Sequence, residues 1–305
     1  MNHETDYSHS KYIGIWYAVA AYTAWGFLPL YWKGLQQVPA AEILAHRILW
    51  SFLFVSAILV VYGRWRSIKE VIADRKNRIG IFLGALMISA NWFIYIWAIN
   101  ADQIVEASLG YYINPILMIL LGLAVLRERL DFWQLISVLM ASTGVAIITL
   151  QYGKIPWVAL SLALTFGLYG LVKKLVKVDS IIGLALETIF VAPVALIYVI
   201  TKQLGGTGSF GTVSFNITLL LICSGVATAT PLLWFAQGAK RVPLSTIGFI
   251  QYLSPSISLL LGIFLYKEQF TKVHLISFGF IWCALVMYTV SRTSFMRQLQ
   301  PKYFQ

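Results

Sequence analysis

Charge is what this sequence has least of. Only 11% of its 305 residues are Asp, Glu, Lys or Arg, whereas soluble domains carry about 25%. A surface that faces water on all sides cannot be built from so few charged residues. The sequence therefore excludes an ordinary soluble globular protein, and it contains no polar stretch long enough for a separate soluble domain.

Cysteine is scarce too. Cys223 and Cys283 are the two cysteines, and both lie in apolar stretches. A disulfide-rich secreted scaffold is excluded, and we expect both residues to be small and buried. The first eleven residues contain one lysine before an apolar run that starts at Tyr12. This is not the basic leader of a cleaved signal peptide, so we expect that run to be kept as the first helix.

The motifs of several enzyme classes are also missing. The sequence contains no Walker A pattern, no zinc-type cluster and no serine-centred nucleophile elbow. A GxGxxG pattern at 206–211 follows no predicted β-strand, so it is a coincidence of composition. We therefore expect no ATP-driven reaction, no hydrolysis, no cofactor and no metal, and the chain is not predicted to be an enzyme.

Apolar residues are what the sequence has in excess. They make up 59% of the chain, and the mean hydropathy is +0.76. A helix of about 20 apolar residues is about 30 Å long, which matches the hydrocarbon core of a bilayer. The predicted fold class is an all-α integral membrane protein with ten transmembrane helices, at 12–32, 40–62, 79–100, 105–126, 132–151, 155–172, 181–201, 215–238, 244–266 and 273–291.

The basic residues indicate an orientation. The net charge is +11, and 17 of the 23 Lys and Arg residues flank the spans on the side of the two termini, five flank the other side, and Arg47 lies within a span. The positive-inside rule then places both termini in the cytoplasm. The excess charge indicates membrane topology, with lipid as a partner, rather than a nucleic-acid partner. Stretch 64–78 reads either as a solvated loop or as an interfacial helix on anionic lipid.

An internal repeat divides the chain. At an offset of 140 residues, Tyr112, Pro115 and Glu128 match Tyr252, Pro255 and Glu268, and at an offset of 141 Gly26 matches Gly167. We predict a first repeat at 12–151 and a second at 152–292, between an N-terminal segment at 1–11 and a cytoplasmic tail at 293–305. Because five spans is an odd number, the second repeat is inverted, and inverted repeats are typical of alternating-access transporters.

Four segments carry a family resemblance: AWGFLPLYWKG (24–34), EILAHRILWS (42–51), EASLGYYINP (106–115) and TPLLWFAQGAKRVPLSTIGFIQYLSP (230–255). They resemble the RarD branch of the EamA drug/metabolite transporters, and the likeness covers the whole chain. The resemblance implies a bacterial inner-membrane permease of ten helices with a central cavity between the halves. It also implies the branch's association with chloramphenicol sensitivity, and no defined cargo.

Arg47, His46 and Glu187 lie deep inside predicted spans, where charge is costly. Arg47 is a candidate for binding an anionic group of the cargo, and His46 or Glu187 for exchanging a coupling proton. The alternative is structural, because an ion pair between Arg47 and Glu187 satisfies both charges without any cargo.

Pro115 and Pro255 occupy equivalent places in the two repeats, and paired interruptions of helices point to a binding site. We predict a helix interruption at each. The alternative is a packing kink. The predicted substrate-binding residues are Arg47, Trp92, Tyr111, Tyr112, Asn114, Gln251 and Tyr252.

These features together predict a secondary transporter that moves a small amphiphilic molecule, of the drug or metabolite type, across the cytoplasmic membrane by alternating access. A membrane-embedded enzyme or sensor that uses the same cavity is the alternative. A homodimer is left open as the state of assembly.

Overall fold

The computed structural model describes residues 2–101, 103–266, 271–291 and 293–301. These residues form thirteen α-helices and no strand, which confirms the predicted fold class. The helices are α1 (Asn2–Lys33), α2 (Ala40–Val61), α3 (Trp65–Ala73), α4 (Arg75–Asn100), α5 (Ile104–Ala124), α6 (Phe132–Gln151), α7 (Trp157–Leu175), α8 (Ser180–Leu204), α9 (Phe215–Arg241), α10 (Leu244–Gln251), α11 (Leu253–Phe264), α12 (Lys272–Ser291) and α13 (Ser294–Gln298).

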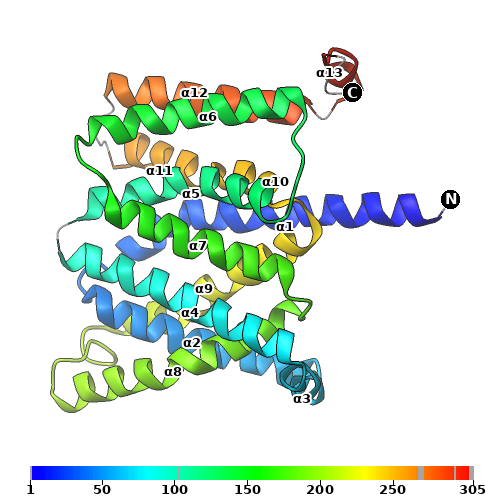
Figure 1. Ribbon diagram of the computed structural model, residues 1–305. Coiled ribbons are helices and arrows are strands. Elements are labelled where there is room, and N and C mark those ends of the chain that lie inside the picture. Colours follow the sequence, from blue (N-terminus) through cyan, green and yellow to red (C-terminus); the bar gives the residue numbers. More distant parts are fainter. Residues whose placement is uncertain (1, 102, 267–270, 292, 302–305) are drawn as a thin grey trace.

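Ten spans within the described residues are long and apolar enough to cross a membrane, and α10 and α11 together make one of them. The chain is thus a multi-pass membrane protein. Both termini lie at the same end of the bundle, and α3 lies at that end too (Figure 1). We call this end the terminal end. The loop between α8 and α9 lies at the opposite end (Figure 1).

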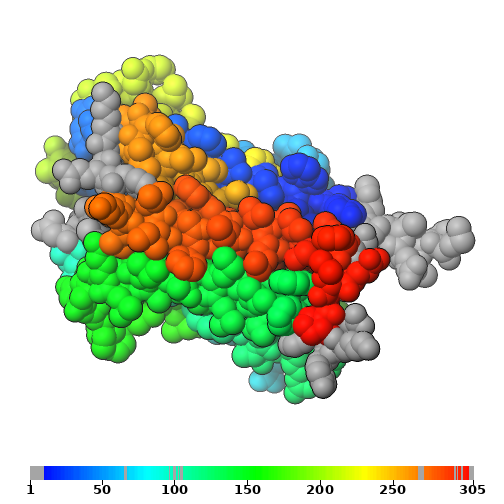
Figure 2. Space-filling view, turned by 90° about the horizontal axis from the view of Figure 1, so that it is seen from above, coloured from blue at the N-terminus to red at the C-terminus, as the bar shows by residue number. Residues whose placement is uncertain are grey.

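The helices of the two predicted repeats pack mainly on each other. In the first half of the chain α1 packs on α9, α2 on α8 and α9, α4 on α7, α5 on α7 and α10, and α6 on α12. Figure 2 shows α6 and α12 side by side across one face of the molecule. Because neighbours in space come from opposite halves, the bundle has one shared interior rather than two separate cores.

The terminal end of this interior is filled with apolar side chains. The ends of α2 and α9 and the start of α4 contribute Val55, Leu59, Ala239 and Ile81 to one buried cluster. This packing fills the terminal end of the bundle and leaves no room there for a large cavity between the halves.

One expectation about the periphery needs correction. Cys223 and Cys283 are exposed on the bundle surface rather than buried, because a span needs to bury only the face that it turns toward its neighbours. The helix α1 begins at Asn2 and its start projects beyond the bundle (Figure 1), while the stretch that could span a membrane starts at Ser10. Residues 1 and 302–305 of the predicted terminal segments, and Glu268 of the repeat match, lie outside the described residues.

The two prolines behave differently, which corrects the predicted pair of interruptions. The helix α5 continues through Pro115. The ninth span is broken at Tyr252, between α10 and α11. A proline ring clashes with the carbonyl of the residue four positions earlier, and for Pro255 that residue is Gln251, where α10 ends. Among the described residues, the helix is thus interrupted near Pro255, at Tyr252, and continues through Pro115.

Candidate functional site

A cavity of about 470 Å³ lies between the two halves of the bundle. Its volume is within the range of small-molecule sites. It is lined by parts of α1, α2, α4, α5, α7 and α9 and by both sides of the break between α10 and α11: Tyr22, Trp25, Leu28, Pro29, Trp32, Ala40, Ile43, Leu44, Arg47, Ile88, Asn91, Trp92, Tyr95, Ala107, Ser108, Gly110, Tyr111, Tyr112, Asn114, Leu162, Phe166, Thr228, Leu232, Gln251, Ser254, Pro255 and Ser258.

The cavity lies toward the end of the bundle opposite the termini. Its lining includes the first residue of α2, Ala40, and the late residue Tyr95 of α4. These positions lie at the opposite end from Leu59 and Ile81, which close the terminal end. The cavity therefore lies toward one side of the bundle, and packed side chains close the other side.

Arg47 is the charged residue in this lining, which contains no carboxylate among the described residues. Its Nε donates a hydrogen bond to Thr228 Oγ1 at 3.0 Å, and its guanidinium carbon lies 4.6 Å from the ring centroid of Trp32. The ion pairs among the described side chains join other residues, Arg64 with Asp179 and Lys173 with Glu187. The positive charge of Arg47 thus faces the cavity without an acidic partner from the described part of the chain.

Eight of the 27 residues that line the cavity are aromatic. Trp25 packs edge-on against Tyr22, at 5.2 Å between centroids, and against Phe166, at 5.8 Å. Tyr95 and Tyr111 make another edge-on contact at 6.4 Å. Trp92 lines the cavity as well. Such walls provide large apolar contact area with polar groups at their edges, which suits an amphiphilic ligand.

Amide and hydroxyl groups sit around the helix break. Gln251 Oε1 accepts a hydrogen bond from Tyr22 Oη at 3.3 Å. Asn114 is 4% exposed, its Nδ2 donates to the carbonyl of Ala163 at 3.5 Å, and its Oδ1 has no hydrogen-bond partner among the described residues. Because a buried acceptor without a partner is costly, Asn114 can accept a hydrogen bond from a bound molecule.

Six of the seven predicted substrate-binding residues thus line one cavity, and the seventh does not. Tyr252 is fully buried, belongs to a core cluster with Ile119 and Tyr288, and donates to the carbonyl of Tyr112 at 3.5 Å. Adjacent residues on a helix point in directions about 100° apart, and Gln251 takes the direction that faces the cavity. Of the two prolines, Pro255 lines the cavity and Pro115 does not.

His46 lies outside the cavity although it neighbours Arg47 in sequence. Its ring stacks on Phe210 at 5.1 Å, and its Nδ1 accepts a hydrogen bond from Trp50 Nε1 at 3.3 Å. The loop that carries Phe210 is held by Glu42, whose carboxylate accepts from the Ser209 backbone N–H at 2.6 Å and from its hydroxyl at 2.9 Å. The structure therefore places His46 under the loop between α8 and α9.

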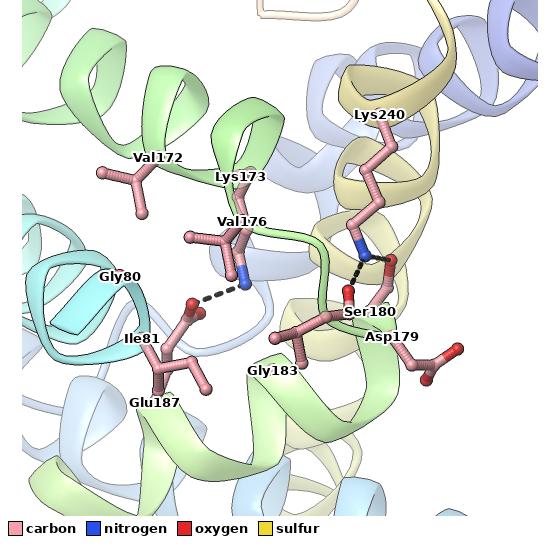
Figure 3. Close-up of a pocket in the computed structure, with 11 residues that line it drawn as sticks. Gly80, Ile81, Val172, Lys173, Val176, Asp179, Ser180, Gly183, Glu187 and Lys240 are labelled. Atoms are coloured by element: carbon pink, nitrogen blue, oxygen red, sulfur yellow. Dashed lines mark hydrogen bonds and ion pairs between the residues drawn. The ribbon is translucent and has the colours of Figure 1, made fainter. Parts of the chain in front are cut away.

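Glu187 lies at the terminal end, in a small polar pocket away from the cavity (Figure 3). Its carboxylate pairs with Lys173 Nζ at 2.6 Å and accepts from Tyr169 Oη at 3.2 Å. Lys240 reaches the same pocket and donates to Ser180 Oγ at 3.0 Å. The alternative ion pair of Glu187 with Arg47 is thus not formed.

The sequence also holds site residues that its patterns did not indicate. Thr228 and Trp32 orient Arg47, and Lys173 neutralises Glu187. Thr228 is a polar residue in the middle of an apolar span. This position only weakly indicates a functional role, because a threonine hydroxyl readily hydrogen-bonds to a backbone carbonyl of its own helix. Lys173 follows directly after the predicted sixth span, so it was counted with the flanking basic residues.

Comparisons with known proteins agree with the ten-span fold. The EamA-like transporter family matches residues 12–150 and again residues 154–290. An "Uncharacterized transporter YojE" of Bacillus subtilis is 46% identical over 287 residues, covering 93% of this chain and 96% of that protein. The "Protein RarD" of Escherichia coli is 39% identical over 287 residues, covering 92% and 97%.

A solved structure supports the fold. A protein crystal structure with 19% sequence identity matches with a TM-score of 0.71 and covers 94% of this chain and 99% of its own. At this identity the likeness concerns the fold alone. The two family matches together extend over almost the whole sequence, and the chain therefore belongs to the EamA-like transporter family.

Proposed function

We propose that this protein is a secondary transporter that moves a small amphiphilic molecule with an anionic group across the cytoplasmic membrane by alternating access. The observation that carries the proposal is Arg47, a cation without an acidic partner in the lining of an aromatic cavity. Arginine binds carboxylates and phosphates through two parallel hydrogen bonds. An anionic group of the cargo is the partner that this guanidinium needs within the membrane.

The geometry around Arg47 supports this assignment. Thr228 uses the Nε hydrogen, and Trp32 covers the guanidinium, so the side chain is oriented before any cargo binds. The aromatic wall at Trp25 and Phe166 then receives the apolar part of the cargo, and Asn114 accepts a hydrogen bond from a polar group. Preorganised groups of this kind raise affinity because little entropy is lost on binding.

Packing contacts support the inverted repeat that alternating access requires. A Cβ atom on Gly26 of α1 would lie 2.7 Å from Ile257 of α11, and one on Gly167 of α7 would lie 3.2 Å from Leu117 of α5. Gly167 is the counterpart of Gly26, and Leu117 is the counterpart of Ile257. The same close contact therefore recurs in both halves, as it does when two copies of one unit pack with opposite orientation.

The distribution of basic residues supports an orientation with both termini in the cytoplasm. In that orientation the cavity faces the outside of the cell. Proton coupling through Glu187 is part of the same proposal: its carboxylate pairs with Lys173 while the terminal end is closed, and opening of that end separates the pair and exposes the carboxyl to proton exchange.

The test is uptake and counterflow in proteoliposomes, with and without a pH gradient, for a panel of labelled aromatic and aliphatic carboxylates and phosphates, each beside its neutral amide or ester. We expect the anions to be carried and the neutral forms to be excluded. Arg47→Ala should abolish transport, and Arg47→Lys should keep part of it, since lysine retains the charge and loses the planar fork.

Arg64→Gln is the matched control, because Arg64 is exposed and pairs with Asp179 at the terminal end. It should transport like the unmodified protein. A transport-competent Arg47→Ala variant would show that the guanidinium is structural and that the cargo does not need an anionic group.

A further inference from the structure

The helix α3 lies across the terminal end of the bundle and does not continue a span. It follows a turn at Gly63, where φ is +63°, and it ends before Asp74. Figure 1 shows α3 end-on, whereas the spans run across the view. A helix that crosses the direction of the spans, at the level where they end, runs along the membrane surface.

One side of α3 is fastened to the bundle. Ile68 and Val71 are partly buried and pack against the main core cluster. Arg64, which directly precedes α3, pairs with Asp179, which directly precedes α8, at 2.6 Å. These contacts hold α3 in place against the spans, so residues 64–73 are not a freely solvated loop.

Exposed apolar side chains lie on α3 and on the spans that flank it in the chain. Ile72 of α3 is exposed, although its neighbour Val71 packs on the bundle. Val61 and Tyr62 at the end of α2 and Ile79 near the start of α4 are exposed as well. At the edge of a bilayer such side chains contact acyl chains, and tyrosine is enriched at the level of the headgroups.

The same stretch carries an excess of positive charge. Residues 64–78 contain six Lys and Arg and two acidic residues. Lys69, Arg75 and Lys76 are exposed, and the ion pairs among the described side chains include none of them. The carboxylate of Asp74 accepts a hydrogen bond from the backbone N–H of Lys76 at 2.8 Å, so it caps the helix α4.

The charges of Arg75 and Lys76 do not stabilise the helix that they begin. The helix α4 starts at Arg75, and its first turn contains no acidic residue. Cations near the N-terminus of a helix oppose its dipole. An anionic partner outside the chain would offset this repulsion.

We propose that α3 and the start of α4 form a binding surface for anionic phospholipid in the leaflet at the terminal end. The headgroup phosphates contact Lys69, Arg75 and Lys76, and the acyl chains contact Ile72. Amphipathic helices with basic residues beside apolar ones bind anionic lipid in this way, because apolar burial and charge attraction add together. The side chain of Lys69 can lie along apolar surface while its ammonium group stays among the headgroups.

This surface is separate from the cavity, whose lining contains none of these residues. The proposal therefore adds a lipid partner and does not depend on the class of cargo. It also decides between the two interpretations of residues 64–78, in favour of an interfacial helix.

Quenching by brominated lipid tests the proposal. In full-length protein with Cys223 and Cys283 replaced by serine, because both are exposed, a fluorophore is attached to the thiol of the Ile72→Cys variant. The protein is placed in phosphatidylcholine vesicles with about a quarter phosphatidylglycerol, and the acyl chains of either one lipid or the other carry bromine. We expect phosphatidylglycerol to quench about threefold more than its share of the vesicle. This excess should disappear in 1 M salt, where the Debye length is about 3 Å.

Matched variants separate charge from position. Val194→Cys is the reference position, because Val194 is exposed within the span α8, and its quenching should follow the composition of the vesicle. Arg75→Gln/Lys76→Gln should lower the excess at α3 by about half, because two of the proposed phosphate contacts lose their charge. Arg127→Gln/Arg129→Gln removes two other exposed cations, between α5 and α6, and should leave the excess unchanged.

Three results would overturn the inference. A fluorophore on α3 that neither brominated lipid quenches would show a solvated helix. Equal quenching per molecule by the two lipids would show contact with lipid but no selection for charge, and an excess that survives Arg75→Gln/Lys76→Gln would remove the proposed phosphate contacts. The Val194→Cys reporter in the Arg75→Gln/Lys76→Gln protein shows whether that variant is still inserted in the bilayer, so a lost fold is not mistaken for lost lipid binding.

Discussion

Arg47 and Glu187 show two ways in which this bundle holds a charge away from water. Glu187 is 3% exposed and has a full counter-charge in Lys173 at 2.6 Å, with a further hydrogen bond from Tyr169. Arg47 has one neutral hydrogen bond, from its Nε to Thr228, and the face of Trp32. Glu187 thus has a charged partner and a second hydrogen bond, whereas the guanidinium of Arg47 has further N–H donors besides the one bound to Thr228.

The Lys173 and Glu187 pair leads to a prediction about stability. Glu187→Leu leaves Lys173 buried without its partner, and removal of one member of a buried pair costs about 3–5 kcal/mol. We therefore expect a large fall in the thermal unfolding temperature of the purified protein. The double variant Glu187→Leu/Lys173→Met should recover most of this loss, since apolar residues often replace a buried pair at little cost.

Asp179→Asn is the matched control, because it breaks the exposed pair with Arg64. Exposed pairs contribute about 0–1 kcal/mol, so its unfolding temperature should change little. Equal losses for Glu187→Leu and Asp179→Asn would mean that burial does not govern the energy of these pairs.

At the scale of residues, the sequence shows which side chains carry a free-energy cost inside the membrane. It does not show in which direction these side chains point. A charged residue inside an apolar span must have a partner or face a cavity, and this argument finds both Arg47 and Glu187. It does not distinguish them, because the Lys173 partner comes from another helix. Tyr252 and Gln251 are neighbours in sequence, but their side chains point in different directions. Tyr252 packs in the core and Gln251 lines the cavity.

At the scale of elements, close helix contacts depend on glycine. Gly80 and Gly84 form the GxxxG pattern of α4: a Cβ on Gly80 would lie 2.1 Å from Val176, and one on Gly84 would lie 2.7 Å from Glu187 Oε1. The helix α4 therefore lies directly on the Lys173 and Glu187 pair. The two glycines thus allow close helix packing, and the helix that they bring close covers the buried ion pair.

The pair of α6 and α12 provides a test of this principle away from the cavity. A Cβ on Gly144 of α6 would lie 2.6 Å from the backbone carbonyl oxygen of Ser277 in α12. Because backbone cannot yield easily, Gly144→Ala should destabilise the protein by about 1–3 kcal/mol. Gly279→Ala on α12 meets nothing within 4 Å and should be neutral or stabilising, since alanine favours helix. The measurement is the unfolding temperature of both variants, and a more stable Gly144→Ala protein would contradict the packing argument.

The break in the ninth span shows what an element's sequence leaves open. Pro115 and Pro255 lie at matching positions of the repeat, and the same local rule predicts an interruption at both. Yet α5 stays continuous, and α10 and α11 separate at Tyr252. Both spans carry a proline at the matching position, but the two prolines have different surroundings. Pro115 lies where α5 packs against α10, whereas Pro255 lines the cavity. Tertiary context therefore decides the outcome.

At the scale of the whole molecule, hydropathy and charge predict most of the architecture. Ten apolar stretches of spanning length become ten spans because backbone groups in lipid must bond within their own helix. The packed terminal end and the cavity toward the opposite end do not follow from the sequence, since hydropathy and charge do not say which side chains meet between helices.

The orientation of the bundle is open to a direct experiment. Helix α3 and the loop between α8 and α9 lie at opposite ends of the molecule (Figure 1), and Lys69 in α3 and Thr207 in the loop are both exposed. In intact cells, with Cys223 and Cys283 replaced by serine because they are exposed too, a membrane-impermeant maleimide should label Thr207→Cys and spare Lys69→Cys. After the membrane is opened both variants should react, which controls for the reactivity of each thiol. The reverse pattern would turn the cavity toward the cytoplasm and break the positive-inside rule for this chain, whereas labelling of both sites in intact cells would be incompatible with the five spans that separate them and with two inverted halves.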